Sequence, residues 1–352
     1  MLVWCTGISG SDRRSYVAEA AQACREKLNR SCRVIDVGEL LEKVLDDLKV
    51  GASPTELLDG NEDVLRLTRY SALTALKNEI DSATEDLVIV STHACFMRRA
   101  RMMPGLDMHF LKRELAGKID VFATVVHDCH ASWLELQKRI EWRDHLSLAQ
   151  VAVWRDFEIA LTKMLAEYED RRFYLLARKD PAMGLAKLAM EPPTPSLYLS
   201  YPMTAITKTD PKLLKKASAL ADQLRSEGFV VFNPMSIGDV PVTRAATGTQ
   251  EDDITKEMED EAAPYLNSQT VVRDLQLIDQ ADFVVVYYPT DKVSPGVYTE
   301  MSHARDRRRP LYLIGFPGAP ESVSPFLGLF YTKTYKTIDE AIPELKQMHL
   351  AG

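Results

Sequence analysis

Short runs of apolar residues alternate with longer amphipathic segments along this 352-residue chain. The short runs, rich in β-branched residues, predict buried strands, and the segments with apolar positions three and four apart predict helices. The predicted strands are residues 2–6, 33–37, 87–91, 121–126, 173–177, 196–200, 230–232, 283–287 and 311–314. The predicted helices are residues 14–28, 65–80, 148–168, 211–227, 269–280, 298–307 and 338–348. This alternation is typical of α/β folds with parallel sheets.

The composition of the chain changes near residue 190. Every Cys and every Trp lies before residue 155, whereas of the 18 prolines only Pro54 and Pro104 precede residue 181. The stretch 190–196 is rich in proline, so it cannot continue a helix and favours an extended linker. We therefore expect two three-layer α/β domains with mainly parallel sheets, at 1–189 and 197–352.

Charge and cysteine content narrow the class of protein. Asp and Glu outnumber Lys and Arg by 51 to 43, and the net charge of −8 argues against a nucleic-acid binder. No apolar run approaches the roughly 20 residues that span a bilayer, and the first residues do not resemble a secretory signal. The five cysteines form no CxxC pair, which disfavours a disulfide framework or a thiolate zinc site. We expect a cytoplasmic protein with no metal and no cofactor.

The segment after the first predicted strand has the position of a P-loop, where a strand turns into a helix and backbone N–H groups wrap a phosphate. The GxxxxGK[ST] pattern fails at three successive places, where Asp12, Arg13 and Arg14 replace Gly, Lys and the magnesium-binding hydroxyl. We expect Asp12 to oppose a bound anion and to resist the positive φ that Gly permits. The residues of this degenerate phosphate loop are Gly7, Gly10, Arg13, Arg14 and Ser15.

Over roughly residues 1–178, this half resembles archaeal-type adenylate kinases and related P-loop nucleotide kinases. Besides the loop, residues 88–94 are similar to the family's strand ending in Asp-Thr-His-Ala, except that Ser91 stands in place of Asp. Residues 103–106 resemble its Pro-Gly-Leu-Pro segment, and residues 137–144 resemble its Arg-rich lid. The resemblance implies a P-loop kinase-like fold that has lost its phosphoryl-transfer groups. Arg13 and Arg14 leave a nucleotide sensor open, with a nucleotide effector at this domain.

The second half places two carboxylates where parallel α/β sheets bind ligands. Asp274 lies on a predicted helix, a β-branched strand follows at 283–287, and a Ser-Pro-Gly loop then enters a helix whose first turn carries Glu300. Ligands bind outside the carboxyl ends of such strands. Ser294 and the backbone N–H groups from Gly296 onward would form an anion pocket there. Two carboxylates in one cleft are what glycosyl chemistry requires.

Residues 196–316 resemble the nucleoside 2-deoxyribosyltransferase superfamily, which has a Rossmann-like fold, and most closely its branch of 2'-deoxynucleoside 5'-monophosphate N-glycosidases. That branch has the same order: Arg-Asp, Ala-Asp ahead of a hydrophobic strand, then Ser-x-Gly-Val-x-x-Glu. The resemblance implies that Glu300 is the nucleophile and Asp274 the partner acid. Ser294 stands where deoxyribosyltransferases have Asp, which implies a 5'-phosphate on the substrate. The substrate-binding residues implied by the match are Tyr198, Ser200, Pro202, Met203, Asn233, Ser294, Gly296 and Tyr298.

The expected function is hydrolysis of the N-glycosidic bond of a nucleoside 5'-monophosphate, releasing free base and (deoxy)ribose 5-phosphate. There are three alternatives. The protein could exchange bases as a deoxyribosyltransferase, or it could be a nucleotide kinase or nucleotide sensor. In the third, the first half senses a nucleotide and gates a glycosidase in the second half. Thr204 stands where the branch has a phosphate-binding Arg, and Lys292, Lys208 or an Arg of a neighbouring subunit would have to replace it. We expect a small-molecule nucleotide as partner, no nucleic acid, no membrane, and a homo-oligomer of two or more subunits.

Overall fold

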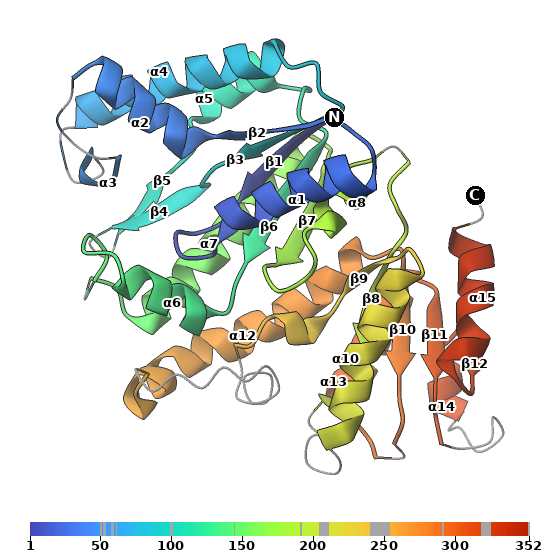
Figure 1. The fold of residues 1–352 in the computed structure, drawn as a ribbon. Helices are drawn as coiled ribbons and strands as arrows, with labels where there is room; N and C mark the ends of the chain where they lie inside the picture. The colour runs from blue at the N-terminus through green and yellow to red at the C-terminus, as the bar shows by residue number, and fades with distance from the viewer. Residues whose placement is uncertain are drawn as a thin grey trace. The chain divides into compact units, whose positions relative to one another are not determined.

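The computed structural model describes residues 1–49, 51, 54–57, 60, 62–98, 101–143, 145–190, 192–203, 211–239, 254–290, 292–317 and 325–350. The chain forms two compact units (Figure 1): Met1–Ala189 together with Glu251–Leu266, and Met190–Gln250 together with Asn267–Gly352. Each unit contains one five-stranded parallel sheet with helices, so the expected α/β class with mainly parallel sheets is confirmed. Within the described residues, no helix is both long enough and apolar enough to cross a membrane.

The first unit is built on a sheet of order β2-β3-β1-β6-β7, in which all pairs are parallel. Its strands are β1 (Leu2–Thr6), β2 (Cys32–Asp36), β3 (Leu87–Ser91), β6 (Val121–Val126) and β7 (Arg172–Ala177). An antiparallel hairpin of β4 (Cys95–Arg98) and β5 (Arg101–Pro104) is attached. The helices are α1 (Arg13–Lys27), α2 (Val37–Asp47), α3 (Pro54–Leu57), α4 (Glu62–Asp81), α5 (Met108–Phe110), the π-helical turn η1 (Leu111–Leu115), α6 (Cys129–Gln137), α7 (Leu148–Tyr168) and α8 (Met183–Ala189).

The second unit is built on a parallel sheet of order β12-β11-β10-β8-β9. Its strands are β8 (Ser196–Ser200), β9 (Val230–Phe232), β10 (Phe283–Tyr287), β11 (Leu311–Ile314) and β12 (Lys333–Tyr335). Its helical elements are α10 (Pro211–Ser226), the 3₁₀ turn η2 (Pro234–Ser236), the second part of α12 (Lys256–Gln280), α13 (Pro295–Asp306), α14 (Pro325–Gly328) and α15 (Ile338–His349).

Successive side chains of strand β8 point to opposite faces of the second sheet. Leu197 and Leu199 join the hydrophobic cluster that includes Leu224 of α10 and Leu345 of α15. Tyr198 and Ser200 point to the opposite face and reach α13, where both contact Glu300. The strand therefore contributes apolar side chains to one face and two hydroxyl groups to the other.

Helix α12 begins well before the predicted start at residue 269. Its first turns carry Met258, Ala262 and Leu266, which pack with Cys129 and Ala149 in a hydrophobic cluster of the first unit. The segment Glu251–Leu266, which the composition assigned to the second domain, therefore clusters with the first unit. Pro264 lies inside α12, next to this change of unit, and its missing N–H removes one hydrogen bond from the helix.

Candidate functional site

Glu300 is the centre of a hydrogen-bonded cluster in the second unit. The hydroxyl of Tyr198 donates to Glu300 Oε1 at 3.0 Å, and the hydroxyl of Ser200 donates to Oε2. Tyr198 and Ser200 are both fully buried and lie two positions apart on β8, so the strand brings both hydroxyls to one carboxylate. Hydrogen bonds of this kind favour the ionised form of the carboxylate.

Asp274 on α12 shares this environment, and it is 8% exposed. Burial raises the pKa of Glu300 to about 8, and the charge of Asp274 adds to that rise. Burial also raises the pKa of Asp274 to about 6, against the opposing influence of Arg273. Burial together with the charges of Glu300 and Asp274 raises the pKa of Tyr198 well above its ordinary range. Between about pH 6 and 8, the two carboxylates therefore hold one proton between them; Glu300, the group of higher pKa, is its main holder, and Asp274 carries most of the negative charge.

Arg273, the residue before Asp274, is paired with a second buried acid. Its Nη1 lies 2.7 Å from Asp239 Oδ2, and its Nε lies 3.4 Å from Asp274 Oδ1. The Arg-Asp pair at 273 and 274 is visible in the sequence, whereas Asp239 was not predicted as a site residue. Asp239 precedes Arg273 by 34 positions and belongs to no periodic pattern, so the sequence contains no signal for this contact.

Helix α13 begins at Pro295, three residues earlier than predicted, with Ser294 as its N-cap. Glu300 consequently lies in the second turn of α13, and the expectation of a first-turn position was wrong. The extension arises because Pro is favoured at the first helical position, where its missing N–H is not needed. Gly296 precedes Glu300 by four residues, so both lie on the same face of the helix, about 6 Å apart along its axis.

The start of α13 has the features of an open anion-binding end. The Ser294 hydroxyl makes no capping hydrogen bond, and its backbone N–H donates to the Tyr288 hydroxyl at 3.0 Å. The first N–H to bond within the helix is that of Tyr298, which donates to the Ser294 carbonyl. A Cβ added at Gly296 would meet nothing within 4 Å, so there is open space beside Gly296 at this helix end.

Three other predicted residues have structural contacts of their own. Asn233 caps η2: its Oδ1 accepts hydrogen bonds from the Tyr201 hydroxyl at 2.7 Å and the Met235 N–H at 3.1 Å. Pro202 is buried, and Met203 packs against the hydrophobic cluster on the face of the sheet away from Glu300. A substrate role for these three residues remains a prediction.

Tyr298 and the candidate phosphate-binding cations complete the predicted set. The ring of Tyr298 meets that of Phe330 edge to face at 6.4 Å between centroids. Lys292 is exposed in the loop ahead of α13. Thr204 and Lys208 lie outside the described residues.

The degenerate phosphate loop of the first unit contains the buried side chain of Arg13. Arg13 Nη1 donates to the Gly7 carbonyl at 2.7 Å, and Nε donates to the Ser91 hydroxyl at 2.9 Å. Ser91 in turn donates to Asp36, whose other oxygen accepts from Arg14 at 2.7 Å. Burial lowers the pKa of Arg13, and the Asp36 charge opposes this. Both arginines are thus bound to groups of the protein.

Asp12 adopts the conformation that the sequence analysis expected it to resist. Its φ is 55° and its ψ is 32°, in the left-handed region, which Asp enters more readily than most residues with a side chain. Its carboxylate accepts hydrogen bonds from Arg178 at 2.8 Å and from Ser15 at 2.5 Å. Gly10 has a φ of 85°, and a Cβ there would lie 2.5 Å from the Ser132 carbonyl, so only glycine fits.

A second acid, Glu158 of α7, lies buried against the same loop. It accepts hydrogen bonds from the backbone N–H groups of Gly7 at 3.0 Å and of Ala94 and Cys95 at 2.8 Å. Burial raises the pKa of Glu158. The backbone N–H of Gly7, the first residue of the phosphate loop, is therefore bound to a carboxyl group of the protein. The bounds of α7 were predicted correctly from the sequence, but Glu158 was not predicted as a site residue.

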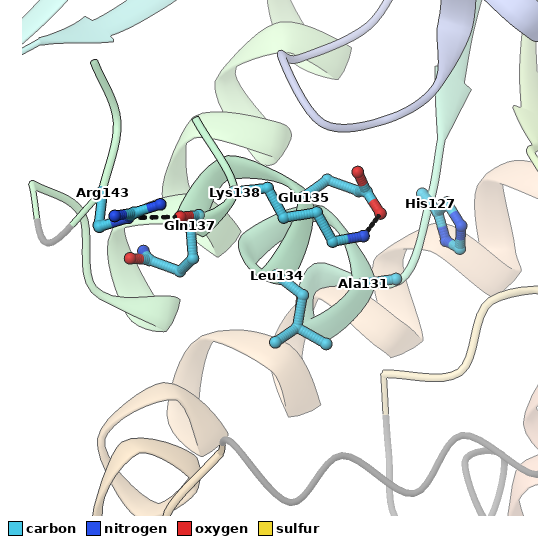
Figure 2. Close-up of a pocket in the computed structure, with 7 residues that line it drawn as sticks. All are labelled: His127, Ala131, Leu134, Glu135, Gln137, Lys138 and Arg143. Carbon is cyan, nitrogen blue, oxygen red and sulfur yellow. Dashed lines mark hydrogen bonds and ion pairs between the residues drawn. The ribbon is translucent and has the colours of Figure 1, made fainter. Parts of the chain in front are cut away.

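The first unit also contains a surface hollow of about 470 Å³ (Figure 2). Two interactions join residues of its lining: the Glu135–Lys138 ion pair at 2.5 Å, and a hydrogen bond from Arg143 Nε to the Gln137 carbonyl at 3.1 Å. Burial lowers the pKa of His127. The hollow contains none of the predicted site residues. It is lined by His127, Ala131, Leu134, Glu135, Gln137, Lys138 and Arg143.

Among the described residues, no group of three or more His, Cys, Asp or Glu side chains is arranged to hold a metal ion. No protein-family model matches the sequence, and no curated protein matches it.

Two solved structures show a likeness to parts of the fold. A shikimate kinase from Bacteroides thetaiotaomicron matches at 16% identity and a TM-score of 0.31, over 51% of this chain and 88% of that one. The CMP N-glycosidase BcmB of Clostridium botulinum matches at 14% identity and a TM-score of 0.26, over 44% of this chain and 98% of that one. At these scores we draw no functional conclusion from either likeness.

Proposed function

We propose that this protein hydrolyses the N-glycosidic bond of a nucleoside 5'-monophosphate, releasing the free base and (deoxy)ribose 5-phosphate. The observation that supports this most strongly is the coupled carboxylate pair in the second unit. Glu300 accepts two hydroxyl hydrogen bonds, and the charge of Asp274 acts on it. A nucleophilic carboxylate beside a carboxylic acid is the minimal apparatus for cleaving a glycosidic bond.

In the proposed reaction, the proton that the pair shares passes from Glu300 to Asp274, and the ionised Glu300 then attacks C1' as the C1'–N bond to the base breaks. The electron pair of that bond leaves with the base, which takes a proton from Asp274. Asp274, now ionised, then takes a proton from water, and the resulting hydroxide displaces Glu300 from C1'. Tyr198 and Ser200 orient the Glu300 carboxylate and stabilise its charge when it departs. Both carboxyl groups return to their starting state, so the cycle balances with water as the only co-substrate.

The 5'-phosphate would bind at the start of α13. Ser294 offers a hydroxyl that caps nothing within the helix, and there is open space beside Gly296 in the first turn. The positive end of the helix dipole favours an anion at this place. Because Gly296 lies one turn before Glu300 on the same helix face, a phosphate held there would leave the sugar close to the carboxylate.

The rate of hydrolysis is expected to have a bell-shaped dependence on pH, with its maximum near pH 7. Below about pH 6 both carboxyl groups are protonated and no nucleophile remains, and above about pH 8 both are ionised and no acid remains. Initial rates of base release between pH 4.5 and 9.5, in buffers of constant ionic strength, measure the two limbs. A rate that stays constant from pH 5 to 9 would show that this pair does not carry the proton transfers.

The Ser294→Asp variant is expected to lower kcat/KM for a nucleoside monophosphate about a hundredfold, because a carboxylate placed beside the phosphate repels it. The matching nucleoside, which lacks the phosphate, should be affected much less. Ser294→Ala is the control, since it removes the hydroxyl without adding charge and should cost about tenfold or less. Equal losses on nucleotide and nucleoside would place the phosphate elsewhere.

Phosphoryl transfer by the first unit has little support from its own residues. The guanidinium of Arg13 is bound to the loop and to Ser91, and the Glu158 carboxyl group takes the N–H that opens the loop. We therefore propose that the first unit is not a kinase. Transfer to a second base in place of water would use the same carboxylates, and product analysis with a free acceptor base present separates that reaction from hydrolysis.

A further inference from the structure

Asp239 and Arg273 form a buried ion pair next to the proposed active site. The Asp239 Oδ2 to Arg273 Nη1 distance is 2.7 Å, and the two side chains are 0% and 5% exposed. Burying two charges costs several kcal/mol, and such a pair is weak as a device for stability alone. The mechanism above assigns no role to either residue.

Arg273 connects this pair to Asp274. Its Nε lies 3.4 Å from Asp274 Oδ1, so one guanidinium faces two carboxylates at once. Asp239 occupies the Nη1 side and Asp274 the Nε side, and the planar fork of Arg suits this double contact. Among the described residues, the groups that act on the Asp274–Glu300 pair are Arg273 from α12, Asp239 from the segment after η2, and Tyr198 and Ser200 from β8.

We propose that Asp239 is a positioning residue for Asp274: it anchors Arg273 and balances its charge, so that Asp274 can hold the proton that the leaving base takes. This inference rests on the proposed glycosidase function. Without the Asp239 charge, Arg273 would act on Asp274 alone and favour its ionised form. The proton shared by the two carboxylates would then pass less readily from Glu300 to Asp274, so the nucleophile would stay protonated and Asp274 would have no proton for the base.

The test compares Asp239→Asn with the wild-type protein and with Asp279→Asn. The asparagine has nearly the same shape and still offers an oxygen to Arg273, so it removes the charge and keeps the contact. Asp279 lies on α12, the helix that carries Arg273 and Asp274. It is paired with His303 at 2.7 Å and Arg307 at 3.0 Å and does not contact Asp239 or Arg273. We expect Asp239→Asn to lower kcat at pH 7 about tenfold and to move the acid limb of the pH profile down by about one unit, with KM nearly constant. Asp279→Asn should change neither.

Asp239→Glu keeps the charge and should restore the acid limb of the wild-type protein. An unchanged acid limb in Asp239→Asn, or a shift of the same size in Asp239→Glu, would overturn the inference and leave Asp239 with a purely structural role.

Carbon-13 NMR titration of the Asp274 carboxyl group in the full-length protein tests, without any catalytic turnover, whether Asp239 affects the protonation of Asp274. The titration midpoint of Asp274 should fall in Asp239→Asn and stay in place in Asp279→Asn. If no nucleotide is hydrolysed but this shift is found, the coupling stands and the proposed function fails. If hydrolysis is found but the midpoint does not move, the function stands and the role of Asp239 is wrong.

Discussion

The Glu300→Gln variant is expected to lower kcat for base release at least about a thousandfold, because an amide cannot form the bond to C1' that splits the reaction into two steps. The amide oxygen can still accept a hydrogen bond from Tyr198 or Ser200, so the site should keep its shape. The variant should unfold at the same or a higher temperature than the wild-type protein, because it removes a carboxyl group whose ionisation is disfavoured in the folded state. The measurement is single-turnover release of base, followed by chromatography.

Glu344→Gln is the matched control for this variant. Glu344 also accepts a hydrogen bond from a tyrosine hydroxyl, that of Tyr335 at 2.6 Å, and is ion-paired with Lys333. It lies on α15, on the face of the sheet away from Glu300. Its replacement should leave kcat unchanged within about twofold. If Glu300→Gln retains more than a tenth of the wild-type kcat while Glu344→Gln is unaffected, Glu300 is not the nucleophile.

The Asp274→Asn variant is expected to lower kcat by about 10²- to 10⁴-fold for natural nucleotides, because a purine or pyrimidine base is a poor leaving group unless it is protonated. A substrate whose leaving group needs no proton separates this role from a general loss of structure. With p-nitrophenyl (deoxy)riboside 5-phosphate, Asp274→Asn should form the glycosyl-enzyme at nearly the wild-type rate and then hydrolyse it slowly. A burst of p-nitrophenolate measures the first step.

Mass spectrometry of the quenched Asp274→Asn reaction should find the sugar phosphate attached to a peptide that contains Glu300. Asp279→Asn, on the same helix, should release base from natural nucleotides at the wild-type rate. An equal loss of activity on both kinds of leaving group would contradict the role of Asp274 as the acid.

The sheets are predictable from sequence because each buried strand is a separate apolar run. Seven of the nine predicted strands have the observed bounds, β2 is shifted by one residue at both ends, β7 begins one residue earlier, and the short edge strand β12 was not predicted. Short elements that contact several neighbours are harder to predict. Helix α6 was missed because Cys129 and Leu136 belong to two different hydrophobic clusters, so its apolar residues do not follow a single face. The β4–β5 hairpin was missed because arginines interrupt its apolar pattern.

Some residues of the candidate site could likewise be predicted from the sequence, and others could not. Tyr198 and Ser200 could be predicted to share a face because strand side chains alternate, and both indeed meet Glu300. Asp239 could not be predicted, because its contact with Arg273 depends on how separate segments pack. The arginines of the degenerate loop illustrate the same limit. The sequence shows two free charges at residues 13 and 14, whereas in the fold Arg13 turns inward to Ser91 and Arg14 pairs with Asp36.

The most direct test of the proposed function is incubation of the protein with a panel of ribonucleoside and deoxyribonucleoside 5'-monophosphates, followed by chromatography of the products. We predict that at least one nucleotide is converted to free base and sugar 5-phosphate in equal amounts, without added metal or ATP. Absence of base release from every member of the panel, with folded wild-type protein at pH 7, would contradict the proposed function.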